Sequence, residues 1–145
     1  FRDQAGAGAI YEMARILDGF RRELGGETYL TFNPGMVLGG TAIEHDAAQS
    51  RGSAFGKSNI IAADAVVTGD LRTISPEQLL ATRARMAEIV FAHLPRTSAE
   101  IVFDDGYPPM APTTPLPPGA SLAEVALRLV ASYIRSGKAV LRRDG

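Results

Sequence analysis

The chain has 145 residues, of which 46% are hydrophobic and 21% are charged, and its formal net charge is −1. These values are ordinary for a single globular domain, and the near-zero charge gives no support to a nucleic-acid partner or an anionic membrane surface. Cysteine is absent, which excludes disulfides and thiolate metal sites, and no apolar run approaches the roughly 20 residues needed to span a bilayer.

The first predicted element is an amphipathic helix. Its apolar positions follow the helical period and are Ile10, Met13, Ala14, Leu17, Phe20 and Leu24. Its polar face is assigned to Glu12, Arg15, Asp18, Arg21 and Arg22. The pair Gly25-Gly26 stands where a helix ends.

The region after this helix offers a strand and then a loop. Residues 29–33 alternate as a strand does, and Asn33-Pro34-Gly35 has the local chemistry of a turn. Residues 41–56 are small, polar and rich in turn formers, so they predict a long loop. The stretch Gly52–Ser58 approaches a phosphate-binding loop, but Arg51 replaces its first glycine and a strand pattern follows, so we reject that interpretation.

The second half begins with the clearest patterns. Residues 63–72 alternate as a strand, with Ala63, Ala65, Val67, Gly69 and Leu71 on its inner face. A helix start follows, with Ser75 as cap, Pro76 in its first turn and Gln78 completing a capping box. The buried stripe of this helix is predicted to be Leu80, Ala84, Ala87, Val90, Phe91 and Leu94.

The remaining residues predict a short strand at 99–104, an irregular linker at 106–112 and a third amphipathic helix from Leu122 to Ile134. The order up to residue 104 is helix, strand, strand, helix, strand, which predicts an α+β sandwich of two helices on an antiparallel sheet. One more strand before Phe1 would complete a ferredoxin-like fold. Because that first strand is missing, either the tail Lys138–Arg142 fills its place or two copies share the sheet.

Metal chemistry finds no support in the sequence. A zinc site needs several His, Cys or carboxylate ligands at short repeated spacings, whereas His45 and His93 stand alone. The Gly-x-Ser-x-Gly elbow of serine hydrolases is also absent. We therefore expect no metal site and no cofactor in this chain.

The stretch Lys57–Thr73 carries a family resemblance. Its Asn59, Asp70 and Arg72 resemble the Asn that opens and the Asp-x-Arg that closes the core strand in the lid, or dimerisation, domain of the aminoacylase and glutamate carboxypeptidase family of di-zinc peptidases. The segments Phe1–Leu17 and Asp105–Pro112 resemble the family's first lid helix and its return to the catalytic domain. The resemblance spans about residues 1–112, and residues 113–145 are left as a linker plus an amphipathic helix.

This resemblance implies a ferredoxin-like lid in which residues 29–38 form one extended segment, with Pro34 on a sheet edge. It implies a homodimer, a catalytic domain that holds the zinc, and a peptide or N-acyl amino acid as substrate. It further implies that Arg72 clamps the substrate carboxylate and that Asn59 donates to the oxyanion, while the isolated fragment is inactive.

Two plainer interpretations stay open at this point. By residue chemistry alone, Arg72 is a surface residue paired with Asp70, and Asn59 is a turn residue. The alternative function is a stand-alone ferredoxin-like module that binds a small molecule or only dimerises.

Overall fold

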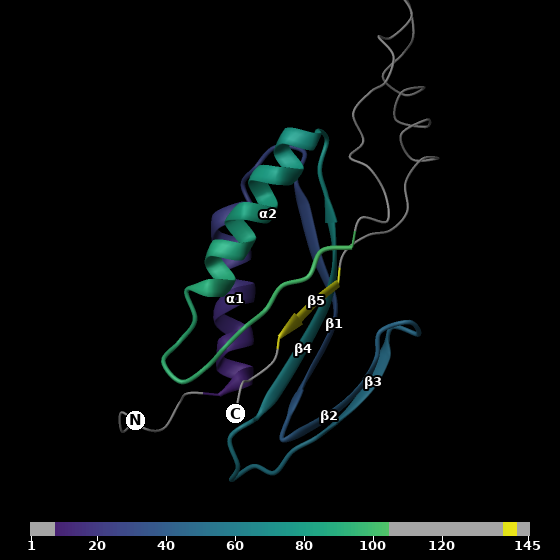
Figure 1. Ribbon diagram of the computed structural model, residues 1–145, viewed down its shortest axis with the longest axis vertical. Coiled ribbons are helices and arrows are strands. Elements are labelled where there is room, and N and C mark those ends of the chain that lie inside the picture. The colour runs from purple at the N-terminus through teal and green to yellow at the C-terminus, as the bar shows by residue number, and fades with distance from the viewer. Residues whose placement is uncertain (1–7, 105–137, 142–145) are drawn as a thin grey trace, which may run out of the picture.

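The computed structural model describes residues 8–104 and 138–141. Figure 1 shows three layers: two helices, a sheet seen nearly edge-on, and a hairpin on the far side of the sheet. The elements in chain order are α1 (Ala9–Leu24), β1 (Thr31–Gly40), β2 (Ala42–Asp46), β3 (Arg51–Phe55), β4 (Asp64–Arg72), α2 (Pro76–Phe91) and β5 (Lys138–Leu141).

The main sheet has the strand order β1-β4-β5, and both pairings are antiparallel. This arrangement is α+β and is compatible with a ferredoxin-like sandwich, as the sequence predicts. Strand β5 belongs to the tail that the sequence offered as a substitute for the missing strand, and it pairs with residues Ala65 to Thr68 of β4. The tail segment therefore fills the gap within one chain.

The core lies between the helices and the sheet. Its buried members are Met13, Ile16, Phe20, Leu24, Ala65, Val67, Leu71, Met86, Ile89 and Val90. The predicted inner face of β4 is confirmed, because Ala65, Val67 and Leu71 all belong to this cluster. The prediction for α1 was wrong at three positions: Ile10 is 44% exposed, Ala14 is exposed, and Glu12, which was assigned to the polar face, is only 2% exposed.

The second helix begins as predicted. The Ser75 hydroxyl accepts a hydrogen bond from Gln78 N–H (3.1 Å), and Gln78 Oε1 accepts one from Ile74 N–H (2.9 Å), one residue before the cap. Of the predicted stripe, however, only Val90 is fully buried. The helix buries Thr82, Met86, Ile89 and Val90, whereas Leu80 and Phe91 are 69% and 67% exposed.

Strand β1 is extended through Pro34, which confirms the extended interpretation over the turn. Pro34 lies on the strand at the outer end of the sheet order, and the ladder shifts register between Pro34 and Met36. A proline is tolerated there because its missing N–H removes no bond from a central ladder.

The predicted loop at 41–56 was wrong, because these residues form the β2–β3 hairpin. The turn is closed by Asp46, whose Oδ1 accepts hydrogen bonds from the N–H groups of Ala48 and Gln49 (both 3.0 Å). A Cβ on Gly52 of β3 would lie 2.4 Å from the backbone oxygen of Glu44 in β2 and 2.5 Å from Leu38 Cδ1 of β1. Glycine is needed at this position because a side chain would clash with the neighbouring backbone.

The predicted strand at 99–104 has no strand assignment in the structure. Ala99, Ile101 and Phe103 nevertheless pack against the core, so alternate residues of the segment face inward. The predicted linker at 106–112 and the third helix at 122–134 lie outside the described residues.

Candidate functional site

Arg72 is the last residue of β4, and its position is set by the sheet. It pairs with Thr31 in the ladder to β1, and its side chain shares a face with Asp70 because alternate residues of a strand point the same way. Arg72 Nε forms a hydrogen-bonded ion pair with Asp70 Oδ2, and the two side chains are 36% and 24% exposed. The plain interpretation of Arg72 as a residue paired with Asp70 therefore holds in this structure.

Asn59 lies at the other end of the same strand. It is exposed, in the irregular segment between β3 and β4, and precedes the first residue of β4 by five positions. The eight steps from Asp64 to Arg72 alone span about 26 Å at the usual strand rise. The structure does not bring Asn59 and Arg72 together in one copy.

Metal binding was tested against the side chains present. Within residues 8–104, no group of three or more His, Cys, Asp or Glu side chains is placed to hold an ion. His45 lies on the hairpin, and His93 follows α2, where its Nδ1 lies 3.1 Å from the carbonyl oxygen of Leu94. The described part of the chain does not fit a zinc centre.

Comparison with known proteins decides the family. The sequence model of a family described as the peptidase dimerisation domain matches residues 2–98, which is more than half of the chain. The chain belongs to this family. No curated protein and no solved structure matches it in the other two comparisons. Neither of the two described helices has the length and apolar character needed to cross a bilayer.

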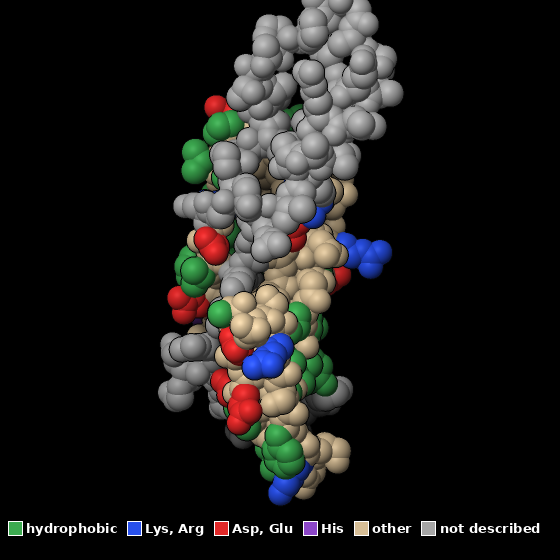
Figure 2. Space-filling model, turned by 90° about the vertical axis from the view of Figure 1, so that its right-hand side faces the viewer, with side chains coloured by type: hydrophobic (Ala, Val, Ile, Leu, Met, Phe, Trp, Pro, Cys, Tyr) green, Lys and Arg blue, Asp and Glu red, His purple; other side chains and the backbone are tan. Residues whose placement is uncertain are grey.

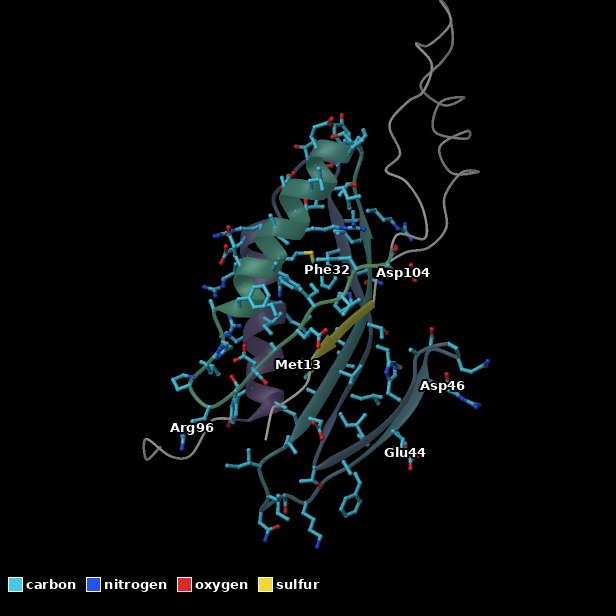
Figure 3. The ribbon with its side chains drawn as sticks, viewed as in Figure 1. Met13, Phe32, Glu44, Asp46, Arg96 and Asp104 are labelled. Carbon is cyan, nitrogen blue, oxygen red and sulfur yellow. The ribbon has the colours of Figure 1, made fainter. Side chains whose placement is uncertain are left out.

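The hairpin of this peptidase dimerisation domain bears a shallow polar hollow. Figure 2, which faces the hairpin side, shows acidic and basic side chains scattered without a continuous patch of one sign. The hollow measures about 430 Å³ and is lined by Glu44, His45, Asp46, Arg51, Gly52 and Ser53. Glu44 and Asp46 lie on the hairpin, well away from Met13 in the core (Figure 3). This mixed charge does not select an anionic or a cationic ligand.

A second hollow is apolar and lies between α1 and β1. It measures about 460 Å³ and is lined by Leu17, Phe20, Leu24, Leu30, Phe32 and Pro34, with Asp18, Arg21 and Gly25 completing its wall. Phe20 and Phe32 meet edge to face there, with ring centroids 5.2 Å apart. Its chemistry suits an apolar group that carries a charged end.

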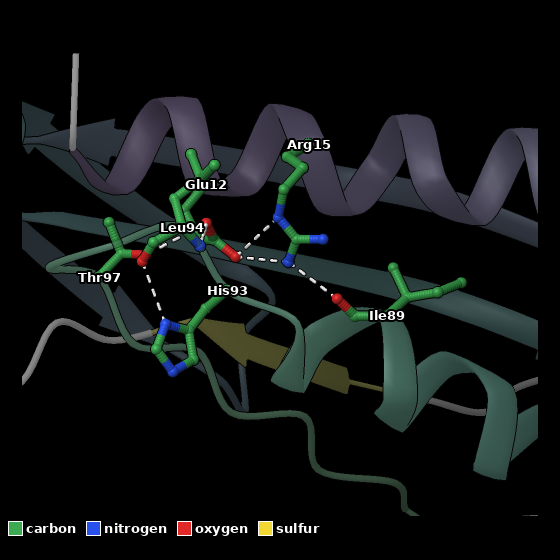
Figure 4. Close-up of polar contacts among 6 residues, drawn as sticks. All are labelled: Glu12, Arg15, Ile89, His93, Leu94 and Thr97. Atoms are coloured by element: carbon green, nitrogen blue, oxygen red, sulfur yellow. Dashed lines mark hydrogen bonds and ion pairs between the residues drawn. The ribbon is translucent and has the colours of Figure 1, made fainter. Parts of the chain in front are cut away.

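A buried carboxylate ties α1 to the end of α2 in the dimerisation domain, a feature that the sequence prediction missed. Glu12 accepts hydrogen bonds from Arg15 Nη2 (2.5 Å), Leu94 N–H (2.9 Å) and the Thr97 hydroxyl (3.1 Å) (Figure 4). Arg15 also donates to the carbonyl of Ile89 (2.8 Å). We name Glu12, Arg15, Leu94 and Thr97 the Glu12 clamp.

The electrostatics of the Glu12 clamp are consistent with an ionised carboxylate. Burial acts to raise the pKa of Glu12, but hydrogen bonds from Arg15, Leu94 and Thr97 together with the charge of Arg15 outweigh it, so the pKa lies below its usual 4.5. Because every oxygen is satisfied from within the fold, we assign the clamp a structural role.

Proposed function

We propose that this chain is the lid and self-association domain of a zinc-dependent peptidase or amidohydrolase of the glutamate carboxypeptidase type. In this proposal the enzyme acts as a homodimer on a peptide or N-acyl amino acid. The zinc belongs to the catalytic domain, because the described residues gather no ligand set for it. The observation that carries the proposal is the family match over residues 2–98 on a two-helix, antiparallel-sheet sandwich.

Arg72 is proposed as the clamp for the substrate carboxylate. A guanidinium presents a planar fork of donors that fits a carboxylate, and Asp70 holds this one, partly exposed, at the C-terminal end of β4. Asn59 is proposed as a donor to the oxyanion, from the exposed segment at the other end. Since one domain cannot bring both to one small substrate, a shared substrate would take Arg72 from one copy and Asn59 from its partner.

The first test uses the chain itself. Sedimentation equilibrium at about 10–100 µM, a range in which weak interfaces still register, should show a dimer. Elemental analysis should show no stoichiometric zinc, and N-acyl amino acids should not be hydrolysed. A clean monomer would remove the self-association part of the proposal, and one tightly held zinc per chain would overturn the lid assignment.

The second test uses the enzyme that carries this domain. Arg72→Ala should lower kcat/KM by an amount that corresponds to a loss of about 2–4 kcal/mol in transition-state stabilisation. Arg72→Lys should restore little of this loss, because an ammonium cannot form the bidentate fork. Asn59→Ala should lower kcat about 100-fold with little change in KM. Wild-type kinetics from a folded Arg72→Ala enzyme would return Arg72 to a structural partner of Asp70.

A stand-alone small-molecule module is the second candidate function, and the apolar hollow between α1 and β1 favours it. A ligand with an apolar body would displace water from the walls formed by Leu17 and Phe32. Thermal-shift screening of hydrophobic amino acids and their N-acyl derivatives tests it. Stabilisation that Leu17→Glu abolishes would support this function, and no stabilisation by any of them would remove it.

A further inference from the structure

The side chain of Gln78 lies at the end of the sheet that carries Arg72, where α1 leads into β1 and β4 leads into α2 (Figure 1). Its Oε1 accepts a hydrogen bond from Ile74 N–H (2.9 Å). Its Nε2 donates to the carbonyl oxygen of Thr28 (2.9 Å) and to Glu27 Oε1 (2.7 Å). This one amide therefore joins the β4–α2 turn to the α1–β1 loop fifty positions earlier. We call these three hydrogen bonds the Gln78 brace.

The Gln78 brace stands directly beyond the last pair of the ladder between β1 and β4, which is Thr31 with Arg72. Ile74 follows Arg72 by two residues, and Thr28 precedes Thr31 by three. The end of a ladder opens more readily than its middle, because no further pair holds it on one side. The amide of Gln78 supplies a constraint across this end, so it stabilises the pair that positions Arg72.

The loop that the Gln78 brace holds is strained. Tyr29 has a φ of 63°, in the left-handed region that a bulky residue rarely adopts, and its side chain is 72% exposed, so burial does not offset the cost. Such a conformation persists only where the surrounding structure fixes it, and strained residues cluster at ligand sites. The brace bonds Thr28 on one side of Tyr29, and Leu30 N–H donates to the carbonyl oxygen of Glu27 (3.3 Å) on the other.

We propose that Gln78 is a positioning residue, which fixes the direction in which the Arg72 guanidinium meets a substrate carboxylate. This inference rests on the proposed clamp role of Arg72 and adds the residue that orients it. Arg72 shares a face with its ion partner Asp70 only while β4 stays extended to its last residue. A planar fork binds a carboxylate through two parallel hydrogen bonds, so a guanidinium that turns freely binds it less tightly.

The substitution Gln78→Glu separates the brace from the cap of α2. A carboxylate still accepts from Ile74 N–H, and glutamate at the third helical position suits both a capping box and the positive end of a helix, so the chain should stay folded. It cannot donate to Thr28, and it repels the carboxylate of Glu27. The matched control is Ser75→Ala, which removes the cap hydrogen bond to the same residue and leaves the brace in place.

The chain itself gives the first readout, through the Nε–H group of Arg72 that donates to Asp70. Its NMR order parameter should fall in Gln78→Glu below about 0.6, the range of flexible groups, and stay unchanged in Ser75→Ala. Glu27→Gln, added to Gln78→Glu, returns a donor to the side-chain pair and should restore part of the loss. An order parameter that Gln78→Glu leaves unchanged would overturn the brace as the device that orients Arg72.

The second readout uses the enzyme that carries this domain. Gln78→Glu should raise KM for an N-acyl amino acid at least about fivefold with little change in kcat, because a misdirected fork binds substrate and transition state equally less well. Ser75→Ala should leave KM unchanged. In an Arg72→Ala enzyme, Gln78→Glu should have no further effect on kcat/KM, because the two residues act through one contact. Additive effects of the two substitutions would reduce Gln78 to a structural residue and overturn the proposal.

The same kinetics distinguish a failed positioning role from a failed clamp. If Arg72→Ala lowers kcat/KM and Gln78→Glu leaves KM unchanged, the clamp stands and the positioning role of Gln78 is overturned. If a folded Arg72→Ala enzyme has wild-type kinetics, the clamp itself is overturned, and the positioning role falls with it.

Discussion

Replacing Glu12 by glutamine isolates the contribution of the Glu12 clamp to stability. Glutamine keeps the shape of the side chain but removes the negative charge, so Arg15 loses its ion partner beside a carboxylate site that is only 2% exposed. Breaking a fully buried pair costs about 3–5 kcal/mol, and Arg15 is about a quarter exposed, which lowers that figure. We expect about 2–3 kcal/mol, since the hydrogen bonds from Leu94 and Thr97 also weaken.

Urea unfolding followed by circular dichroism measures this change, because a loss of stability shifts the midpoint without changing the slope. The control is Asp18→Asn, which makes the same carboxylate-to-amide change on the same helix. Asp18 and Arg22 form an exposed ion pair with side chains 59% and 69% exposed, so this variant should lose no more than about 0.5 kcal/mol. A Glu12→Gln chain as stable as Asp18→Asn would refute the clamp as a stabilising element.

Three further results are expected. The difference in unfolding free energy between wild type and Glu12→Gln should have its full size above about pH 4.5, the pKa of Glu12 in the unfolded chain. It should disappear as the pH falls through the lower pKa of the folded state, because the folded environment of Glu12 stabilises only the ionised carboxylate. A difference that persists at about pH 2 in urea titrations would contradict this. Ser75→Ala should lower the free energy of unfolding by about 1 kcal/mol, because the helix loses its capping hydrogen bond to Gln78 N–H. Ser53→Ala, at an exposed position, should leave stability unchanged. Equal melting temperatures for the two variants would argue against the cap. Met86→Ala should lower the free energy of unfolding by about 2–4 kcal/mol, and Leu80→Ala should lower it by less than about 0.5 kcal/mol, at concentrations where the chain is monomeric. If urea unfolding gave the reverse order, the predicted burial of Leu80 would be correct after all.

Local signals in the sequence were sufficient for both helices, the inner face of β4 and the cap at Ser75, since each depends on residues within a few positions. The face of α2 could not be predicted in the same way. The helix carries apolar residues on two sides, and only contact with α1 and the sheet selects Met86 and Ile89 over Leu80 and Phe91. Thr82 is also buried, and because a hydroxyl group is not expected in a core, the sequence gives no sign that this side of the helix faces inward.

The hairpin and the Glu12 clamp were missed for different physical reasons. Strands β2 and β3 show no clear apolar alternation, and β3 is exposed throughout, so their backbone ladder and the Asp46 turn hold them together. Glu12 is buried because Leu94 and Thr97, more than eighty positions away, supply its donors. No local pattern records such a partner.

For the candidate site, the pairing of Arg72 with Asp70 follows from strand alternation and was foreseen as the plainer alternative. The separation of Asn59 from Arg72 also follows from strand geometry, because a single strand lies between them. The family resemblance grouped the two residues by role, and the fold assigns them to opposite ends of one strand.

Because β5 completes one side of the sheet, the two edges of β4 should open at different free energies. On one side β4 pairs with β1 along its whole length, and on the other only four residues pair, with partners at least seventy positions later in the chain. A short strand delivered by so distant a segment forms after the local contacts and detaches at a smaller free energy than global unfolding. Backbone amide hydrogens of β4 that point toward β5 should therefore exchange with solvent when β5 alone detaches. Those that point toward β1 should exchange only through global unfolding of the domain.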